Sequence, residues 1–226
     1  MLQGLASFLP PKRWLAATAV ALLLAGCGTS KPGPPIPGLA DRVELGSVPF
    51  FRGEDNSGSS LALAGLMTAQ GVPITPGLIE KSMHLPQEGE KLQASVQNAA
   101  REFGLVVYPL DASLPALFAQ VAAGNPVLVR YADGRVWTEP RYAVLVGYDR
   151  YKQRVLLRSG NERRKVMSFS SFESAWKGSG SYAVLVQPPT RLPAQVDRQR
   201  WLAAAHELAQ AGQEQAAARA VKAVGP

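Results

Sequence analysis

Residues 142–147 read Tyr-Ala-Val-Leu-Val-Gly, a continuous apolar run in the second half of a 226-residue chain. A strand with one face in water would alternate apolar and polar side chains. An unbroken run of this kind is instead typical of a strand that is covered on both faces. We therefore predict a buried strand here and expect other elements to pack against both of its faces.

Further strands are predicted on either side of this run, next to turn signals. Three apolar residues at 127–129 follow Gly124-Asn125-Pro126, which favours a turn. Two other segments flank Gly160-Asn161 and together predict a hairpin. The predicted strands besides 142–147 are 127–129, 155–157, 165–169 and 181–186.

Helical patterns precede these strands. Apolar residues recur at helical spacing over 92–103 and again over 113–123, while a shorter stripe at 63–67 ends before Gly71. Thr75-Pro76 is typical of a helix start. Because helices come first and an antiparallel sheet second, the predicted class is α+β. The side chains expected to share one core are Leu63, Leu66, Val96, Phe103, Phe118, Val144 and Val146.

The end of the chain, residues 191–226, reads as a helical hairpin. Prolines at 188, 189 and 193 break the chain, and two Ala-rich helices then follow from Trp201, with a turn at Gly212. Their pattern resembles a single tetratricopeptide repeat. One repeat cannot bury its apolar face alone. It therefore packs on the body, caps a partner, or is a remnant.

The first 26 residues resemble the signal peptide of a bacterial lipoprotein. Lys12 and Arg13 precede an apolar run of 11 residues at 14–24, which is short of the roughly 20 residues that span a membrane. The run ends in Leu24-Ala25-Gly26-Cys27, which is similar to a lipobox. This resemblance implies cleavage before Cys27 and attachment of acyl chains such as palmitate to Cys27. The alternative is an ordinary secretory signal followed by a chance cysteine.

The same resemblance implies a location. Residue 28 is Gly and not Asp, which in lipoproteins favours the outer membrane over retention in the inner one. We expect the lipid to hold the protein at the outer membrane, facing the periplasm. Residues 27–46, which are Pro/Gly-rich at 30–38, are predicted to form the tether between lipid and domain.

Composition excludes several classes of function. One cysteine and two histidines, His84 and His206, exclude an internal disulfide and a thiolate metal cluster. We expect no metal and no cofactor. The net charge is +7, and residues 149–165 hold seven Lys and Arg. They form either a solvated hairpin or a patch for an anionic envelope partner. Nucleic acid is not an expected partner, because the lipobox places the domain outside the cytoplasm.

Five separated blocks fall in a recognisable order at workable spacings: Pro49-Phe50-Phe51, Leu63-Ala64 with Gly71, and residues 124–129, 142–149 and 156–160. Together they resemble the C39-like cysteine peptidases, the double-glycine, bacteriocin-processing enzymes with a papain-like fold. The resemblance covers about residues 47–190 and is closest to a lipoprotein branch that carries tetratricopeptide-type helices after the peptidase domain. It implies that a helix at 61–70 faces the strand at 142–147 across a cleft.

The catalytic residues of that family are missing at the matching positions. Its nucleophilic cysteine, which opens the first helix in a Gln-Cys-Gly-Pro context, falls on Gly58. Its oxyanion-hole glutamine, five residues earlier, falls on Gly53. The histidine that opens its His-Tyr-Ala-Val strand is Arg141 here, and the residue that orients the histidine falls on Ser159. The resemblance therefore implies a papain-like cleft that has lost its chemistry.

Three functions remain open at this point. The first is a binding or scaffold module in an envelope assembly, with a protein or peptide partner at the cleft or the helical tail. The second is a peptidase or other hydrolase that uses Ser57 as nucleophile, although Arg141 cannot accept its proton. The third is a spacer. The start of the first helix, at Gly58, Ser59 and Ser60, is with Arg141 a candidate anion site.

Overall fold

The structure is a computed structural model that describes residues 38–53, 58–85, 89–133 and 139–225. Cys27, the predicted signal peptide, most of the predicted tether and Ser57 lie outside the described residues. Among the described helices, none combines the length and the hydrophobicity needed to cross a membrane. The helices are α2 (Gly58–Ala69), α3 (Pro76–Met83), α4 (Gly89–Glu102), α5 (Leu114–Ala122), α6 (Phe169–Gly178), α7 (Arg198–Gln210) and α8 (Glu214–Ala223). The strands are β1 (Arg42–Glu44), β2 (Val106–Pro109), β3 (Val127–Asp133), β4 (Glu139–Asp149), β5 (Arg154–Ser159), β6 (Glu162–Ser168) and β7 (Ala183–Gln187).

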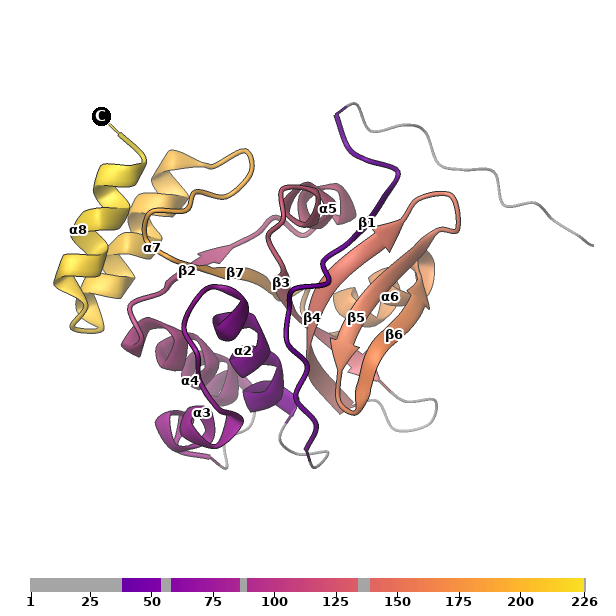
Figure 1. The fold of residues 1–226 in the computed structure, drawn as a ribbon, viewed down its shortest axis with the longest axis horizontal. Helices are drawn as coiled ribbons and strands as arrows, with labels where there is room; N and C mark the ends of the chain where they lie inside the picture. Colours follow the sequence, from indigo (N-terminus) through magenta and orange to yellow (C-terminus); the bar gives the residue numbers. More distant parts are fainter. Residues whose placement is uncertain (1–37, 54–57, 86–88, 134–138, 226) are drawn as a thin grey trace, which may run out of the picture. The chain divides into compact units, whose positions relative to one another are not determined.

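The strands form one antiparallel sheet in which β4 is the longest strand (Figure 1). Their order is β2-β7-β3-β4-β5-β6, and β1 pairs with the end of β4. β4 pairs with β3 through residues 139–145 and with β1 through residues 147–149, so β1 takes over the edge of β4 that β3 leaves. The predicted hairpin around Gly160 is confirmed as β5–β6.

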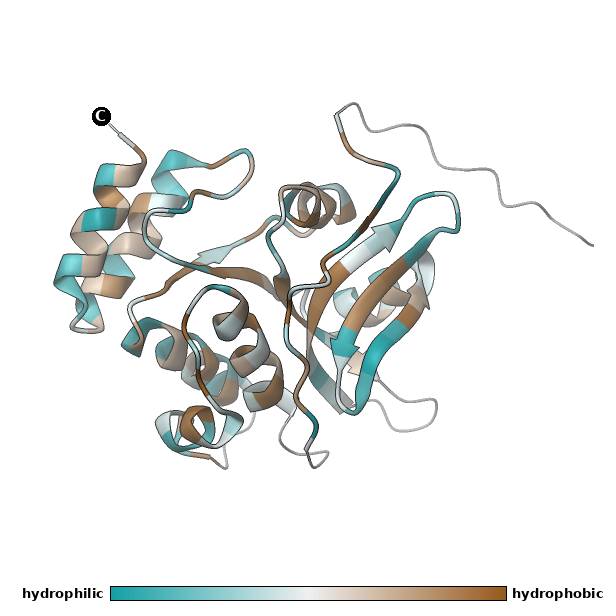
Figure 2. Ribbon diagram, in the orientation of Figure 1, coloured by the Kyte–Doolittle hydropathy of each residue, from teal (hydrophilic) through white to brown (hydrophobic). Residues whose placement is uncertain are grey.

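Helices cover both faces of the sheet, so successive residues of β4 enter two different cores. Val144 and Val146 pack with side chains of α2, α3 and α4. Ala143 and Leu145 pack with side chains of α5, α6 and α7 on the opposite face. In Figure 2 the middle strands are accordingly brown, whereas β6 at the edge is largely teal. The absence of a polar position over 142–147 is therefore explained, and the prediction of a strand covered on both faces is confirmed.

The helix predicted to face this strand does so. α2 packs directly against β4 and is buried from Ser59 to Met67. Its other sides contact α3 and α4, which shield it from solvent. This arrangement explains why α2 lacks a polar stripe: a helix surrounded by other elements is apolar on all sides.

The C-terminal helical pair packs on the body of the domain. Trp201 of α7 is fully buried, lies 6.0 Å from the ring of Tyr108 in β2, and donates from Nε1 to the carbonyl of Ala220 in α8 at 2.8 Å. Arg101 of α4 forms an ion pair with Glu207 of α7. Of the three alternatives for this hairpin, the structure shows the first, which is packing on the body of the domain.

The chain enters the sheet through a segment that contains no helix, residues 39–53, which we call the strap. β1 lies within it, and Tyr148 Oη donates to the carbonyl of Ala40 at 2.9 Å. After β1 the strap passes between α2 and strands β4 and β5 (Figure 1), and Val48 is buried there. The predicted tether, residues 27–46, extends too far, because residues 42–44 belong to the sheet.

The expectation of a single core is wrong in two respects. Phe118 lies across the sheet from Leu63 and Val96, because the sheet divides the apolar side chains into two clusters. Phe103 is 41% exposed. α4 ends at Glu102 and Gly104 turns the chain with a φ of +74°, so Phe103 leaves the apolar stripe of the helix. Three elements, β1, β2 and α6, were not predicted at all.

Gly147→Ala is expected to weaken the pairing of β1 and to lower the free energy of unfolding by about 1–3 kcal/mol. A Cβ at this position would lie 2.6 Å from the carbonyl oxygen of Val43 and 3.1 Å from Cα of Glu44, which are both backbone atoms. Urea unfolding measures the loss. Gly46→Ala is the control on the same strap, because a Cβ there meets nothing within 4 Å. Equal effects of the two substitutions would contradict the close fit of β1.

Candidate functional site

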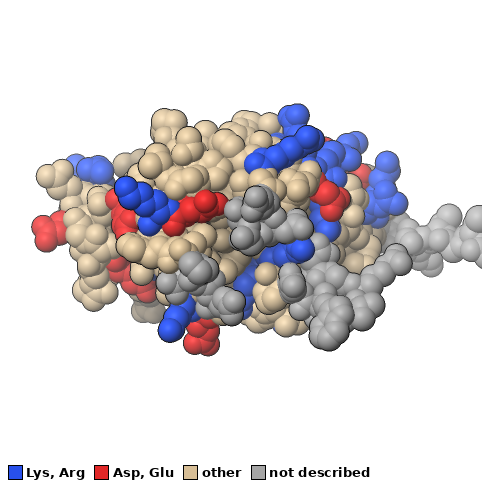
Figure 3. Space-filling view, turned by 90° about the horizontal axis from the view of Figure 1, so that it is seen from below, with Lys and Arg blue, Asp and Glu red and all other residues tan. Residues whose placement is uncertain are grey.

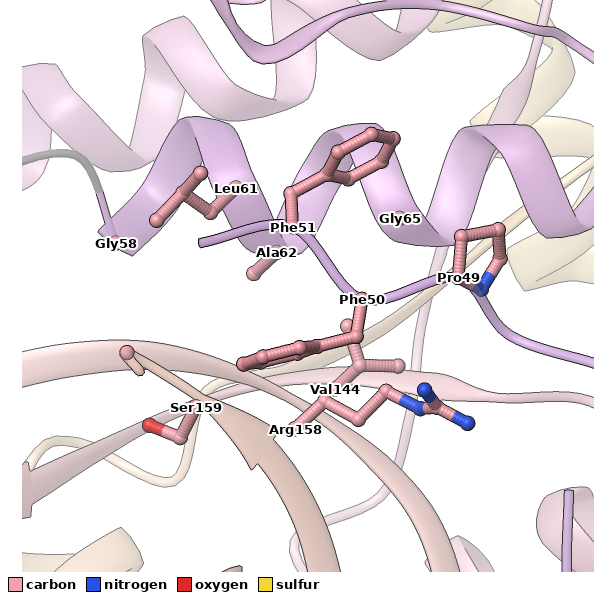
Figure 4. Close-up of a pocket in the computed structure, with 11 residues that line it drawn as sticks. Pro49, Phe50, Phe51, Gly58, Leu61, Ala62, Gly65, Val144, Arg158 and Ser159 are labelled. Atoms are coloured by element: carbon pink, nitrogen blue, oxygen red, sulfur yellow. The ribbon is translucent and has the colours of Figure 1, made fainter. Parts of the chain in front are cut away.

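A pocket lies where the strap passes between α2 and the sheet (Figure 4). Three segments enclose it, because α2 packs over β4 and β5 and the strap fills the space between them. Figure 4 shows the ring of Phe50 in the middle, with α2 on one side and the side chains of Val144 and Arg158 on the other. The lining residues are Pro49, Phe50, Phe51, Gly58, Leu61, Ala62, Gly65, Val144, Arg158, Ser159 and Gly160.

The strap leaves little free space in this pocket. The cavity volume is about 10 Å³, which is close to the least that holds one water molecule. Gly65 permits this close packing, since a Cβ there would lie 2.9 Å from the carbonyl oxygen of Pro49. In the described conformation the strap therefore takes the place that a ligand side chain would need.

The start of α2 carries Gly58, the residue that the sequence resemblance matched to the family's nucleophile. Gly58 is the first residue of the helix and lines the pocket. Ser59 and Ser60 follow and are buried. Ser60 Oγ donates to Glu80 Oε1 of α3 at 2.8 Å, so this hydroxyl joins two helices. Gly53 lies beside the same end of α2, where a Cβ would meet the Leu61 side chain at 3.2 Å.

The positions that match the family's base and its orienting residue lie across the pocket. Ser159 and Gly160 line it at the end of β5. Arg141 Nη1 lies 3.8 Å from the place that a Cβ on Gly160 would take. The structure thus brings Gly58 and Ser159 together at one pocket and places the Arg141 guanidinium next to its Gly160 edge.

The described lining offers no pair of nucleophile and base. Its one hydroxyl, Ser159 Oγ, lies 2.8 Å from Tyr131 Oη in a buried hydrogen bond. Neither histidine is part of the lining: His84 caps the C-terminus of α3, and His206 of α7 lies 3.1 Å from the Gln210 amide. The described residues also contain no group of three His, Cys, Asp or Glu side chains that could hold a metal ion.

Arg158 is a pocket residue that the sequence did not single out. It is only 8% exposed, and its Nε has no hydrogen-bond partner. Its Nη2 makes long contacts of 3.4 Å with the carbonyl oxygens of Leu45 and Gly46. Burial lowers the pKa of this guanidinium, and the charge of Arg163 lowers the pKa further, although arginine stays protonated in proteins. The available signal was its spacing: Arg158 is two residues from Leu156, so both side chains share the face that α2 covers.

Basic side chains also gather outside the pocket. Figure 3 shows them on the side of the molecule that carries the β5–β6 hairpin. Several have acidic partners: Arg164 pairs with Glu44 at 2.9 Å, and Lys165 pairs with Glu162 at 3.1 Å. These pairs favour the interpretation of the hairpin as a solvated basic surface.

Comparison with solved structures identifies the class of fold. A protein from Bacillus anthracis described as a C39-like peptidase matches 65% of this chain and 98% of its own, with 17% identity and a TM-score of 0.52. The peptidase domain of Streptococcus ComA, a bifunctional ABC transporter of a quorum-sensing pathway, matches 62% of this chain and 96% of its own, with 15% identity and a TM-score of 0.50. No protein-family model and no curated protein matches the sequence.

The chain therefore has the α+β, papain-like fold of the C39-like peptidases. This confirms the fold that the sequence resemblance implied. The likeness concerns the fold alone. The chemistry of the pocket depends on the residues that line it in this chain.

Proposed function

We propose that this protein is a lipid-anchored, catalytically degenerate C39 peptidase-like domain that acts as a binding or scaffold module in the bacterial cell envelope. The proposal rests on two residues that the sequence resemblance matches to the family's catalytic pair: Gly58, which lines the pocket, and Arg141, which lies next to its Gly160 edge. Gly58 stands where the family has its nucleophile, and Arg141 stands where the family has its base. The partner is a protein or peptide that binds at the pocket or at the helical tail.

Each of these positions fails for a separate chemical reason. Glycine has no side chain to attack a carbonyl group. A guanidinium has no lone pair to accept a proton near neutral pH. Gly53 cannot supply the side-chain amide that would stabilise an oxyanion, and loss of one such donor typically costs about 10²–10³ in rate. Several roles are missing together, so turnover by the inherited mechanism is not expected.

The packing of the pocket supports a role without turnover. Phe50 lies between α2 and the sheet, and the strap is held there by β1 and by the close approach of Pro49 to Gly65. A peptidase must admit an extended substrate beside its nucleophile, whereas here the chain's own backbone lies next to the start of α2.

The envelope location rests on the sequence. The lipobox-like end of the signal segment supports a lipid on Cys27, and Gly28 supports the outer membrane with the domain in the periplasm. Two or more acyl chains give stable anchoring where one would be marginal.

The detergent-solubilised protein is expected to hydrolyse no peptide in a broad library of fluorogenic substrates. Gly58→Cys combined with Arg141→His should also stay inactive, because Gly53 still lacks the oxyanion donor. Peptide turnover by the unmodified protein that is lost on Ser57→Ala would overturn the proposal in favour of a serine hydrolase. Crosslinking in intact envelopes followed by purification tests the binding role. If no crosslinked protein or peptide is recovered, the binding role is wrong and the domain acts as a spacer.

A further inference from the structure

Arg158 is a buried charge without a counter-ion among the described residues. The carboxylate that acts on it most, Glu44, already pairs with Arg164 at 2.9 and 3.2 Å. Nε has no acceptor, and the two carbonyl contacts of Nη2 are long at 3.4 Å. A buried cation with an unfilled donor is costly unless a partner completes it. This side chain is therefore prepared for an acceptor that is not part of the described chain.

The side chains around Arg158 indicate the chemical character of the ligand that would carry this acceptor. The pocket walls beside it are apolar, being formed by Phe50, Leu61, Ala62 and Val144. A single buried cation with apolar walls fits an anion that carries an apolar group, rather than a fully hydrated ion.

The strap shows that this space accepts a peptide. Its residues 49–51 run between α2 and the strands, and the phenyl ring of Phe50 fills the middle of the pocket. Phe50 is only half-buried, and an apolar side chain of similar size would fill the same space.

We infer that this pocket binds a carboxylate carried by a peptide, with Arg158 as the residue that pairs with the carboxylate and an apolar side chain of the peptide in place of the Phe50 ring. The carboxylate is either the C-terminus of a peptide or an acidic side chain. This inference rests on the proposed function, because it names the ligand of the same site.

The test uses the full-length protein in detergent micelles, labelled with [15N]glycine, because Gly58, Gly65 and Gly160 all line the pocket. The probe is N-acetyl-L-phenylalanine, and its neutral control is N-acetyl-L-phenylalaninamide. We expect the acid to shift the amide signals of these glycines with saturation at millimolar concentrations, and the amide to leave them unchanged. An amide-capped acetyl-Phe-Glu dipeptide separates the two sources of carboxylate: binding tighter than the acid indicates a side chain, and weaker binding indicates a C-terminus.

Arg158→Met should weaken binding of the acid by about tenfold or more, since it removes a charge-assisted hydrogen bond. Arg163→Met is the matched control: it removes the same charge from an exposed position on the same hairpin and should change affinity by less than about twofold. Phe50→Ala should strengthen binding, because the probe then has no ring to displace. The melting temperature of Arg158→Met should not fall, since an unpaired buried charge is exchanged for an apolar side chain.

Several results would overturn the inference. These are equal binding of acid and amide, equal losses in the two arginine variants, shifts caused by inorganic phosphate but not by the acid, or a large fall in melting temperature that makes Arg158 a structural residue. None of these would affect the absence of peptide hydrolysis, so a failed inference and a failed functional proposal can be told apart.

Discussion

Phe118→Ala is expected to lower the free energy of unfolding by about 3–5 kcal/mol. The side chain is 3% exposed and stacks on Tyr148 with ring centroids 4.6 Å apart, and it also contacts Phe169 at 4.9 Å. Its loss removes buried apolar area and leaves a cavity between α5, β4 and the start of α6. Urea unfolding followed by circular dichroism measures the change.

The control for this substitution is the same residue type at a position that the sequence placed in the same core. Phe103→Ala should cost about 1 kcal/mol or less, because Phe103 is 41% exposed. A similar loss in both variants would mean that Phe103 is buried against another surface. A small loss in Phe118→Ala would contradict the core on the α5 face of the sheet.

Cys27→Ser is expected to abolish lipid attachment completely. The lipobox chemistry acylates a thiol, and this chain has no other cysteine to take its place. The protein should then appear either with its signal uncleaved or in the soluble fraction. Labelling with radioactive palmitate and separation of membranes by sedimentation detect both outcomes.

Gly28→Asp is the matched control for the anchor. This variant keeps Cys27, so it should still take up palmitate, but it should move from the outer to the inner membrane fraction. If Cys27→Ser still incorporates palmitate and sediments with membranes, the resemblance to a lipobox is misleading. If the Gly28→Asp variant stays in the same membrane fraction as the unmodified protein, only the predicted location is wrong.

The elements that could be predicted from the sequence are those whose own pattern of apolar residues reflects how they are buried. The run at 142–147 could be recognised because both faces of β4 are covered, which removes every polar position from its middle. β1 could not be recognised in the same way. Its three residues, Arg42 to Glu44, are partly or largely exposed, and they form a strand only because Gly147 leaves room for their backbone. Pairing of this kind depends on a residue more than 100 positions away.

The candidate site was predictable as far as the resemblance reached. Gly58 and Ser159, which the resemblance assigned to the nucleophile and the orienting residue, could be located from sequence blocks, and both line the pocket. Arg158 could not be found so easily. A charged residue in a basic hairpin is typical of a solvated face, and its burial depends on α2 and on the strap, which come from distant parts of the chain.

The order of segments along the strap has a mechanical consequence for the proposed lipid anchor. β1 lies between the N-terminal side of the chain and Phe50, and it is bound to β4 through three residue pairs. A pull on the tether is therefore carried by the β1–β4 ladder and passes into the sheet before it reaches the aromatic ring in the pocket. Under the proposed anchoring, β1 would keep motion of the bilayer from reaching the pocket as long as it stays paired. Tension that breaks the three β1–β4 pairs would act on Phe50 next, so the length of this ladder sets how much tension the pocket withstands.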